Sequence, residues 1–219
     1  MPKNQRAGFQ FFVDISGVPK RDRCGDFQKV IVSCVSFNVF TLKNKIEAFR
    51  EKFPTYWDKK GHQLTKYQLE EIVSFLDQQG VRMTTVHFDP EDWIKYKGEY
   101  PNESHIEEKI MGILYFYVMK WVAREGYIYP VIVDTDTTFS IKQSILICQR
   151  LARSQNLTFD VSFGYVETHP ELRFADWVAS ARRKIYPLDL NNYHHFMILR
   201  NKLPPMYLFN VFKKVRLNP

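Results

Sequence analysis

Hydrophobic and polar positions alternate near the start of the chain and predict a strand there. Residues 9–17 read FQFFVDISG. One face of this strand would carry Phe9, Phe11, Val13 and Ile15. Asp14 would lie beside Phe12 on the other face, where the strand ends. A half-buried carboxylate is costly unless it has a partner, and a turn residue accepting from nearby backbone amides is the common explanation.

The rest of the pattern predicts strands alternating with helices. A second strand, at 27–40, follows a polar, turn-rich stretch and is expected to pair antiparallel with the first. The other predicted strands span residues 81–88, 130–134 and 158–164. The predicted helices span residues 43–52, 66–79, 104–126, 141–153 and 168–186. This order predicts an α/β fold whose sheet opens with an antiparallel hairpin, continues with parallel strands and is flanked by helices.

The predicted helix at 66–79 has the clearest boundaries. Thr65 and Gln68 have the spacing of a capping box, and Gly80 follows the last apolar position. Beyond residue 187 the pattern assigns no element. We expect one domain over residues 1–219, with a helical insertion at about 90–126 and a C-terminal extension at 187–219.

Composition excludes several classes of protein. A hydrophobic content of 45% with 25% charged residues is typical of a folded domain. The longest apolar run, IMGILYFYVM, is too short for a membrane span, and the first residues lack the apolar stretch of a signal peptide. Three dispersed cysteines favour a reducing compartment. We therefore expect no membrane partner and a cytoplasmic location.

The net charge of +7 draws attention to basic clusters. Lys20, Arg21 and Arg23 follow the first strand, and Arg183 lies in a later cluster. Such clusters are most often solvated surface, but around carboxylates they would suit a polyphosphate. These four residues are the candidate phosphate contacts. The 34 aromatic residues (18 Phe, 12 Tyr, 4 Trp) are better explained as core than as stacking platforms for bases.

Two more acidic residues are candidates for a site shared with Asp14. Asp134 ends the apolar run PVIVD, and ligands of open α/β sheets bind outside the carboxyl ends of strands. Asp176 lies between Ala175 and Ala179 on the predicted packing face of the last helix. Each also has a structural explanation: Asp134 as a turn or N-cap residue, and Asp176 as a buried partner of an arginine such as Arg183. Together, three carboxylates predict a site for a hard divalent cation.

These motifs, in this order, resemble a known family. A strand ending in Asp-x-Ser-Gly, an antiparallel second strand, a later strand ending in Asp and a helix carrying Ala-Asp look like the ribonuclease-H-like family of unknown function with an N-terminal DESG-type strand and a late QLAD-type helix. The resemblance spans most of residues 9–186. It implies a ribonuclease H-like fold with Asp14, Asp134 and Asp176 at the acidic positions, and Glu167 at a further polar position.

The chain departs from the family's pattern at two places. Ile15 stands where the family usually has Glu, and Arg173–Phe174 replaces the usual Gln–Leu pair. Because residue 15 points away from the face of Asp14, a metal site could survive the first change. The alternative that the chain is a non-catalytic member of this family therefore stays open.

The predicted function is that of a nuclease dependent on Mg²⁺ or Mn²⁺, acting on RNA or DNA. Asp14, Asp134 and Asp176 would hold the ions, and Glu167 or Asp136 would assist. One alternative is a nucleic-acid or protein binding module without chemistry. Another is a phosphatase with an aspartate nucleophile, since DTDTT from Asp134 resembles the opening motif of haloacid-dehalogenase-like enzymes, although no later Asp-Asp pair supports it. The histidines, having no metal-ligand spacing, are interpreted as loop or strand residues.

Overall fold

A computed structural model describes residues 5–17, 29–88, 106–135, 141–185 and 190–198. Its strands are β1 (Gln5–Arg6), β2 (Phe9–Ser16), β3 (Val30–Asn38), β4 (Arg82–Phe88), β5 (Tyr127–Asp134), β6 (Thr158–Gly164) and β7 (Tyr193–Ile198). Its helices are α1 (Leu42–Lys52), the 3-10 turn η1 (Gly61–Gln63), α2 (Lys66–Gln78), α4 (Ile106–Lys120), α5 (Ile141–Arg153) and α6 (Leu172–Lys184). Each predicted element is present, although the helix predicted at 104–126 ends at Lys120. β1 and β7 were not predicted.

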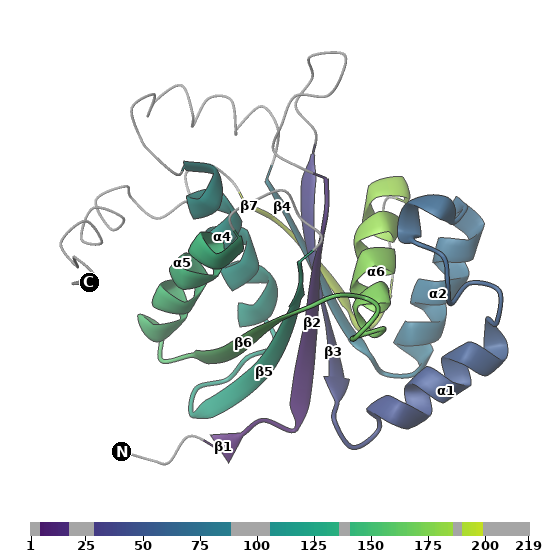
Figure 1. The fold of residues 1–219 in the computed structure, drawn as a ribbon, viewed down its shortest axis with the longest axis horizontal. Helices are drawn as coiled ribbons and strands as arrows, with labels where there is room; N and C mark the ends of the chain where they lie inside the picture. The colour runs from purple at the N-terminus through teal and green to yellow at the C-terminus, as the bar shows by residue number, and fades with distance from the viewer. Residues whose placement is uncertain (1–4, 18–28, 89–105, 136–140, 186–189, 199–219) are drawn as a thin grey trace.

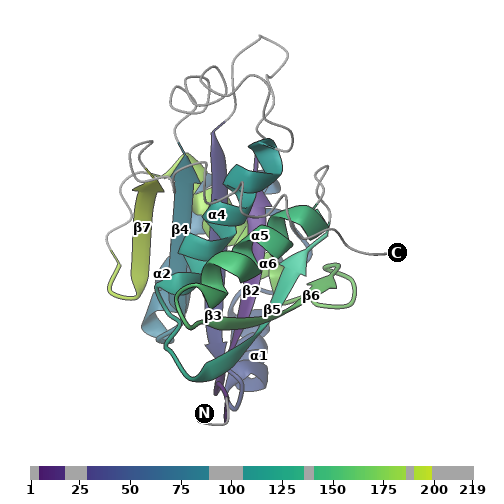
Figure 2. The ribbon, with the colours of Figure 1, turned by 90° about the vertical axis from the view of Figure 1, so that its left-hand side faces the viewer.

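The strands form one mixed sheet with β2 near its middle. β2 pairs antiparallel with β3 and parallel with β5, and β5 pairs parallel with β6. β3 pairs antiparallel with β4, which pairs parallel with β7, while β1 pairs with the start of β5. Figure 2 shows this order across the sheet. The predicted α/β class, with a mixed sheet flanked by helices, is confirmed, as is the antiparallel pairing of the first two predicted strands. The third predicted strand, β4, was expected among the parallel strands but pairs antiparallel with β3.

Helices cover both faces of the sheet. Figure 1 shows the sheet edge-on, with α4 and α5 on one face and α1, α2 and α6 on the other. Part of the predicted insertion, α4, packs against α5 and the sheet, and residues 89–105 lie outside the described residues. β7 falls within the predicted C-terminal extension, whose residues 187–189 and 199–219 are also outside them. In the described chain, no helix combines the length and apolar character needed to cross a membrane.

The two faces of the sheet bury separate hydrophobic clusters. Beneath α4 and α5, Phe11 stacks on Tyr129 with ring centroids 4.9 Å apart. On the α6 face, Phe49 stacks on Trp177 at the same separation. The aromatic residues with almost no exposure are Phe11, Phe12, Phe37, Phe49, Tyr115, Phe116, Phe174 and Trp177. Much of the aromatic content is therefore core, as the sequence predicted.

Candidate functional site

Asp14 and Asp134 lie side by side where two neighbouring parallel strands end. β2 and β5 are paired in register at Val13 and Val133, and each aspartate is the next residue of its strand. Neighbouring strands are about 4.8 Å apart, so the two side chains start from adjacent positions. Both aspartates are only 8% exposed. The tertiary structure thus brings together two carboxylates that lie far apart in the sequence.

Both aspartates belong to the face of the sheet that α6 covers. Phe12 and Ile132, two residues earlier on the same strands, pack in the cluster beneath α6, and alternation carries this orientation to Asp14 and Asp134. The strand register extends from these residues across the sheet. It forms a polar row of Asp134, Asp14, Ser33, Thr85 and His195, one residue from each of five strands. A row of this kind beneath a helix concentrates polar groups in an otherwise apolar layer.

The α6 helix approaches the polar row closely at Ala175. The hydroxyl of Ser33 donates a 2.7 Å hydrogen bond to the carbonyl oxygen of Ala175. A small residue is required here because a larger side chain would hold the helix away from the sheet. Asp14 itself accepts a 2.6 Å bond at Oδ1 from the amide of Ile15. Asp14 thus accepts from a backbone amide, as a turn residue would, and this amide belongs to the next residue.

Tyr115 of α4 adds a hydroxyl near the two carboxylates. This hydroxyl is buried and has no hydrogen-bond partner among the described residues. Its burial, together with the negative charges of Asp14 and Asp134, raises the pKa of Tyr115 well above the usual range. The hydroxyl therefore stays protonated, and it belongs to the helix layer on the face of the sheet opposite to α6.

Asp176 is directed to a different part of the molecule. Its Oδ2 accepts a 2.7 Å hydrogen bond from the amide of Gly61, and its Oδ1 accepts from the hydroxyl of Ser180 at 3.4 Å. Burial raises the pKa of Asp176, while the Gly61 amide, the Ser180 hydroxyl and the nearby charges of His62 and Lys60 act in the opposite direction. The carboxylate thus serves η1, which the sequence did not indicate as its partner.

Arg183 occupies the carboxyl end of β2. Its Nη2 donates two hydrogen bonds of 2.6 Å, to the carbonyl oxygens of Ser16 and Lys29. Gly17 makes room for this guanidinium: its φ is +93°, and a Cβ there would lie 2.2 Å from Nη2. Arg183 therefore joins the end of β2 and the residue before β3 to α6.

The other predicted site residues are less informative. Glu167 is exposed in the turn between β6 and α6. Lys20, Arg21, Arg23 and Asp136 lie outside the described residues. Within the described ranges, no three His, Cys, Asp or Glu side chains are grouped so as to hold a metal ion. The structure therefore does not gather Asp14, Asp134 and Asp176 into one ligand set, because α6 turns Asp176 toward Gly61.

Sequence reasoning missed a histidine pair at the other end of the polar row. Nδ1 of His87 lies 2.8 Å from Nε2 of His195, and the two rings are nearly parallel. The hydroxyl of Thr85 lies 2.8 Å from Nδ1 of His195 and 2.6 Å from the hydroxyl of Tyr193. These four groups form a continuous hydrogen-bonded chain between β4 and β7. The signal was an i, i+2 repeat of polar residues on two strands, which is visible only once their register is known.

The histidine pair is neutral at physiological pH. Burial, aided by the positive charges of Lys29 and Arg182, lowers the pKa of His87 to about 4. Burial likewise lowers the pKa of His195 to about 3, with Arg182, His87 and Lys29 contributing. Two neutral imidazoles can share one N–H···N bond, whereas two imidazolium ions cannot. The hydrogen bond between the rings therefore requires at least one of them to be uncharged.

Comparisons with known proteins add no identification. No model of a protein family matches the chain, and no curated protein matches it either. The functional evidence is therefore the geometry of the polar row and the residues around it.

Proposed function

We propose that the chain is a ribonuclease H-like nuclease that depends on Mg²⁺ or Mn²⁺ and uses Asp14 and Asp134 as its metal ligands. The observation that carries the proposal is the register of β2 and β5, which sets the two carboxylates next to each other at the carboxyl end of the sheet. The mixed sheet, with its antiparallel opening pair and following parallel strands, supports the same assignment.

The donor set of this pair fits magnesium. Mg²⁺ in nucleotide enzymes is typically held by one or two carboxylates, with water and substrate phosphates completing its octahedron. Two neighbouring aspartates therefore suffice when the substrate supplies the other oxygens. A bound ion would supply Lewis-acid polarisation of the phosphodiester and lower the pKa of a bound water. Asp176 is left out of this ligand set because α6 directs its carboxylate toward Gly61.

Three other groups have roles in the proposal that follow from their positions. Arg183, at the end of β2, would direct its remaining N–H groups to a substrate phosphate. Tyr115, protonated and close enough to the carboxylates to sense their charge, would hold an ordered water or a ligand oxygen. Lys20, Arg21 and Arg23 keep their predicted role as phosphate contacts. The substrate would be a nucleic acid.

Matched charge variants test the proposal. Asp14→Asn and Asp134→Asn remove one charge each at the site, and Asp160→Asn removes one from an exposed position of β6. Cleavage of labelled single-stranded RNA, single-stranded DNA and an RNA–DNA hybrid is measured with Mg²⁺, Mn²⁺ or EDTA. We expect metal-dependent cleavage by wild type and Asp160→Asn and none by the site variants. Equal cleavage by all three variants would refute the assignment.

A binding module without chemistry is the second candidate. Ile15 stands where the family that the chain resembles has Glu, and the described residues add no third carboxylate to the pair, which favours this candidate. Melting curves with Mn²⁺ distinguish the two functions, because only a metal site raises the melting temperature in a manner that Asp14→Asn abolishes. Nucleic-acid binding that persists in EDTA, without Mn²⁺ stabilisation or cleavage, would establish the binding module.

A further inference from the structure

A pocket with two arginines lies at the end of the sheet opposite to Asp14 and Asp134. It has a volume of about 300 Å³ and opens where the parallel strands β2, β4 and β5 begin. Its lining includes Phe9, Arg82, Val122, Arg124, Tyr127 and Tyr129. Small-molecule sites start at about this volume, near 300 Å³. The pocket is therefore large enough for a small ligand and is separate from the proposed metal site.

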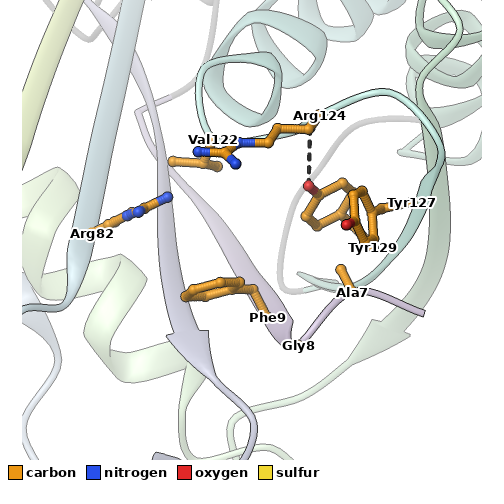
Figure 3. Close-up of a pocket in the computed structure, with 8 residues that line it drawn as sticks. All are labelled: Ala7, Gly8, Phe9, Arg82, Val122, Arg124, Tyr127 and Tyr129. Atoms are coloured by element: carbon orange, nitrogen blue, oxygen red, sulfur yellow. Dashed lines mark hydrogen bonds between the residues drawn. The ribbon is translucent and has the colours of Figure 1, made fainter. Parts of the chain in front are cut away.

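The described residues that line the pocket include two arginines and no acidic side chain. Arg82 comes from the first position of β4, and Arg124 follows α4. In Figure 3 their side chains extend toward one another across the pocket, above the ring of Phe9. Neither guanidinium makes an ion pair in the described part of the chain. Two converging guanidinium groups are the arrangement that binds an oxyanion through several charge-assisted hydrogen bonds.

Aromatic rings form the rest of the pocket and fix its shape. The guanidinium of Arg82 lies over the ring of Phe9, 5.3 Å from its centroid. The hydroxyl of Tyr129 accepts a 2.9 Å hydrogen bond from the backbone amide of Arg124, which holds this residue in place. Tyr127 is 41% exposed, so its ring is open to a planar ligand. Stacking on such a ring is favourable for any nucleobase.

We propose that this pocket binds a nucleotide, with its phosphate between Arg82 and Arg124 and its base against Tyr127. A bare inorganic anion would use the two arginines but would leave the aromatic surface uncovered. A neutral aromatic ligand would leave both charges without a counter-ion. A free nucleoside monophosphate and the phosphorylated end of a strand share the required chemistry. The proposal needs neither Asp14 nor Asp134, so it stands or falls independently of the nuclease assignment.

Binding measurements on the full chain, in EDTA so that no metal site takes part, test the proposal. Calorimetry with AMP and UMP is compared with adenosine, inorganic phosphate and a 5′-phosphorylated tetranucleotide. We expect AMP to bind at least about tenfold more tightly than adenosine or phosphate, since both parts of the pocket contribute. A tetranucleotide that binds more tightly than AMP identifies a strand end as the ligand, and the reverse order identifies a free nucleotide.

Variants link that binding to the pocket. Arg82→Gln and Arg124→Gln should each weaken AMP binding at least about tenfold, whereas Arg153→Gln removes the same charge from an exposed position of α5 and should change nothing. Tyr127→Ala should reduce AMP binding toward that of phosphate. Far-UV circular dichroism checks that each variant is folded. Absence of AMP binding at millimolar concentration, or equal binding by wild type, Arg82→Gln and Arg124→Gln, would overturn the proposal.

Discussion

The Oδ2 atom of Asp176 accepts a 2.7 Å hydrogen bond from the amide of Gly61, 115 positions earlier in the chain. Two other side chains of α6 donate hydrogen bonds to the same segment. Nε1 of Trp177 donates to the carbonyl oxygen of Lys59 at 2.9 Å, and Nζ of Lys184 donates to that of Leu64 at 2.6 Å. The helix thus fixes η1 through three side chains, one of which the sequence interpreted as a metal ligand.

Replacing Asp176 separates its structural role from a role in metal binding. Asp176→Ala leaves the buried Gly61 amide without its acceptor and should lower the free energy of unfolding by about 1–3 kcal/mol. Asp176→Asn keeps an acceptor oxygen and should lose less. Urea denaturation measures both. If Asp176→Ala proves as stable as wild type, the hydrogen bond to Gly61 has no structural role.

The close contact between Gly61 and Ser180 predicts a size limit at position 61. A Cβ on Gly61 would lie 2.2 Å from Oγ and 2.6 Å from Cβ of Ser180. Gly61→Ala should therefore cost about 1–3 kcal/mol of stability. Ser180→Gly alone should cost about 0.5–1 kcal/mol as a helix glycine, yet it should partly restore Gly61→Ala. A double-mutant cycle in urea measures the coupling, and strictly additive losses would contradict the contact.

The neutral histidine pair predicts a loss of stability in mild acid. The pKa values of His87 and His195 in the folded chain, about 4 and about 3, lie below the ordinary histidine value of about 6.5. The unfolded chain therefore binds more protons as the pH falls from about 6.5 toward 4. Each histidine should then reduce the free energy of unfolding by at most about 1.4 kcal/mol per pH unit, with the steepest loss in the middle of this window.

The double variant His87→Gln/His195→Gln tests whether the histidine pair causes this loss of stability. Above pH 7, protonation of these histidines should contribute little to the free energy of unfolding, because both rings are neutral there in the folded and unfolded chain. Between pH 6.5 and 4 the slope of stability against pH should be shallower in the double variant. Urea midpoints at four pH values give this slope. The same slope in both proteins would show that other groups cause the acid sensitivity.

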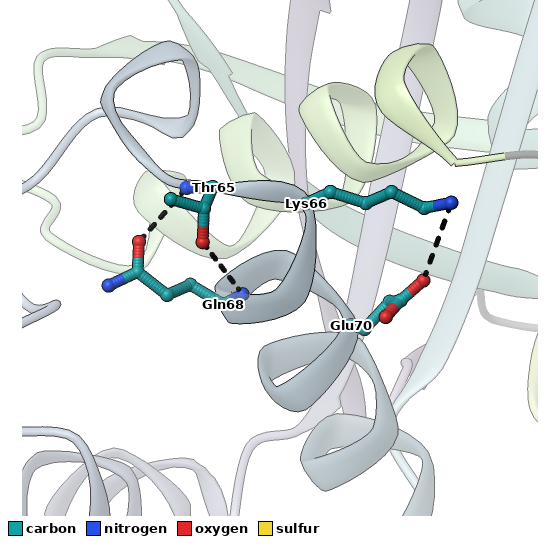
Figure 4. Close-up of polar contacts among 4 residues, drawn as sticks. All are labelled: Thr65, Lys66, Gln68 and Glu70. Carbon is teal, nitrogen blue, oxygen red and sulfur yellow. Dashed lines mark hydrogen bonds and ion pairs between the residues drawn. The ribbon is translucent and has the colours of Figure 1, made fainter.

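The capping box of α2 predicts an unequal effect of two neighbouring residues. Figure 4 shows Thr65 and Gln68 bonded reciprocally, with Oγ1 accepting from the Gln68 amide at 3.2 Å and Oε1 from the Thr65 amide at 2.9 Å. Thr65→Ala should cost about 0.5–2 kcal/mol. Lys66→Gln breaks the exposed 4.0 Å ion pair with Glu70 and should cost about 0–1 kcal/mol. Thermal unfolding compares them, and a larger loss from Lys66→Gln would contradict the assignment of the cap.

The elements that were predicted well have signals within a few neighbouring residues. The strands at 9–16 and 158–164 and the helix at 141–153 have the predicted bounds, because alternation and helical spacing are local patterns. β7 was missed because its sequence, YHHFMI, has no hydrophobic–polar alternation, and its partner β4 lies more than 100 positions away. β1 has two residues and no pattern to detect.

The residues of the candidate site likewise divide into those that a local pattern indicated and those that depend on contacts between distant segments. Asp14 and Asp134 were identified from strand ends, and the register of β2 and β5 then placed them side by side. Asp176 was chosen because it lies between two alanines. Helical spacing gives the face on which a side chain lies, but it does not say which distant segment that side chain contacts. The partner of Asp176, Gly61, and the pairing of His87 with His195 depend on contacts between distant segments.

The amino-acid sequence by itself determined the order of the helices and of strands β2 to β6, the α/β class, the cap of α2 and the two aspartates at strand ends. These follow from propensity, periodicity and capping, which act over a few residues. The tertiary structure alone decided which carboxylates share a face, which serves η1, and that arginines from β4 and the end of α4 line one pocket. Those outcomes depend on strand register and helix rotation, which packing across the whole chain sets.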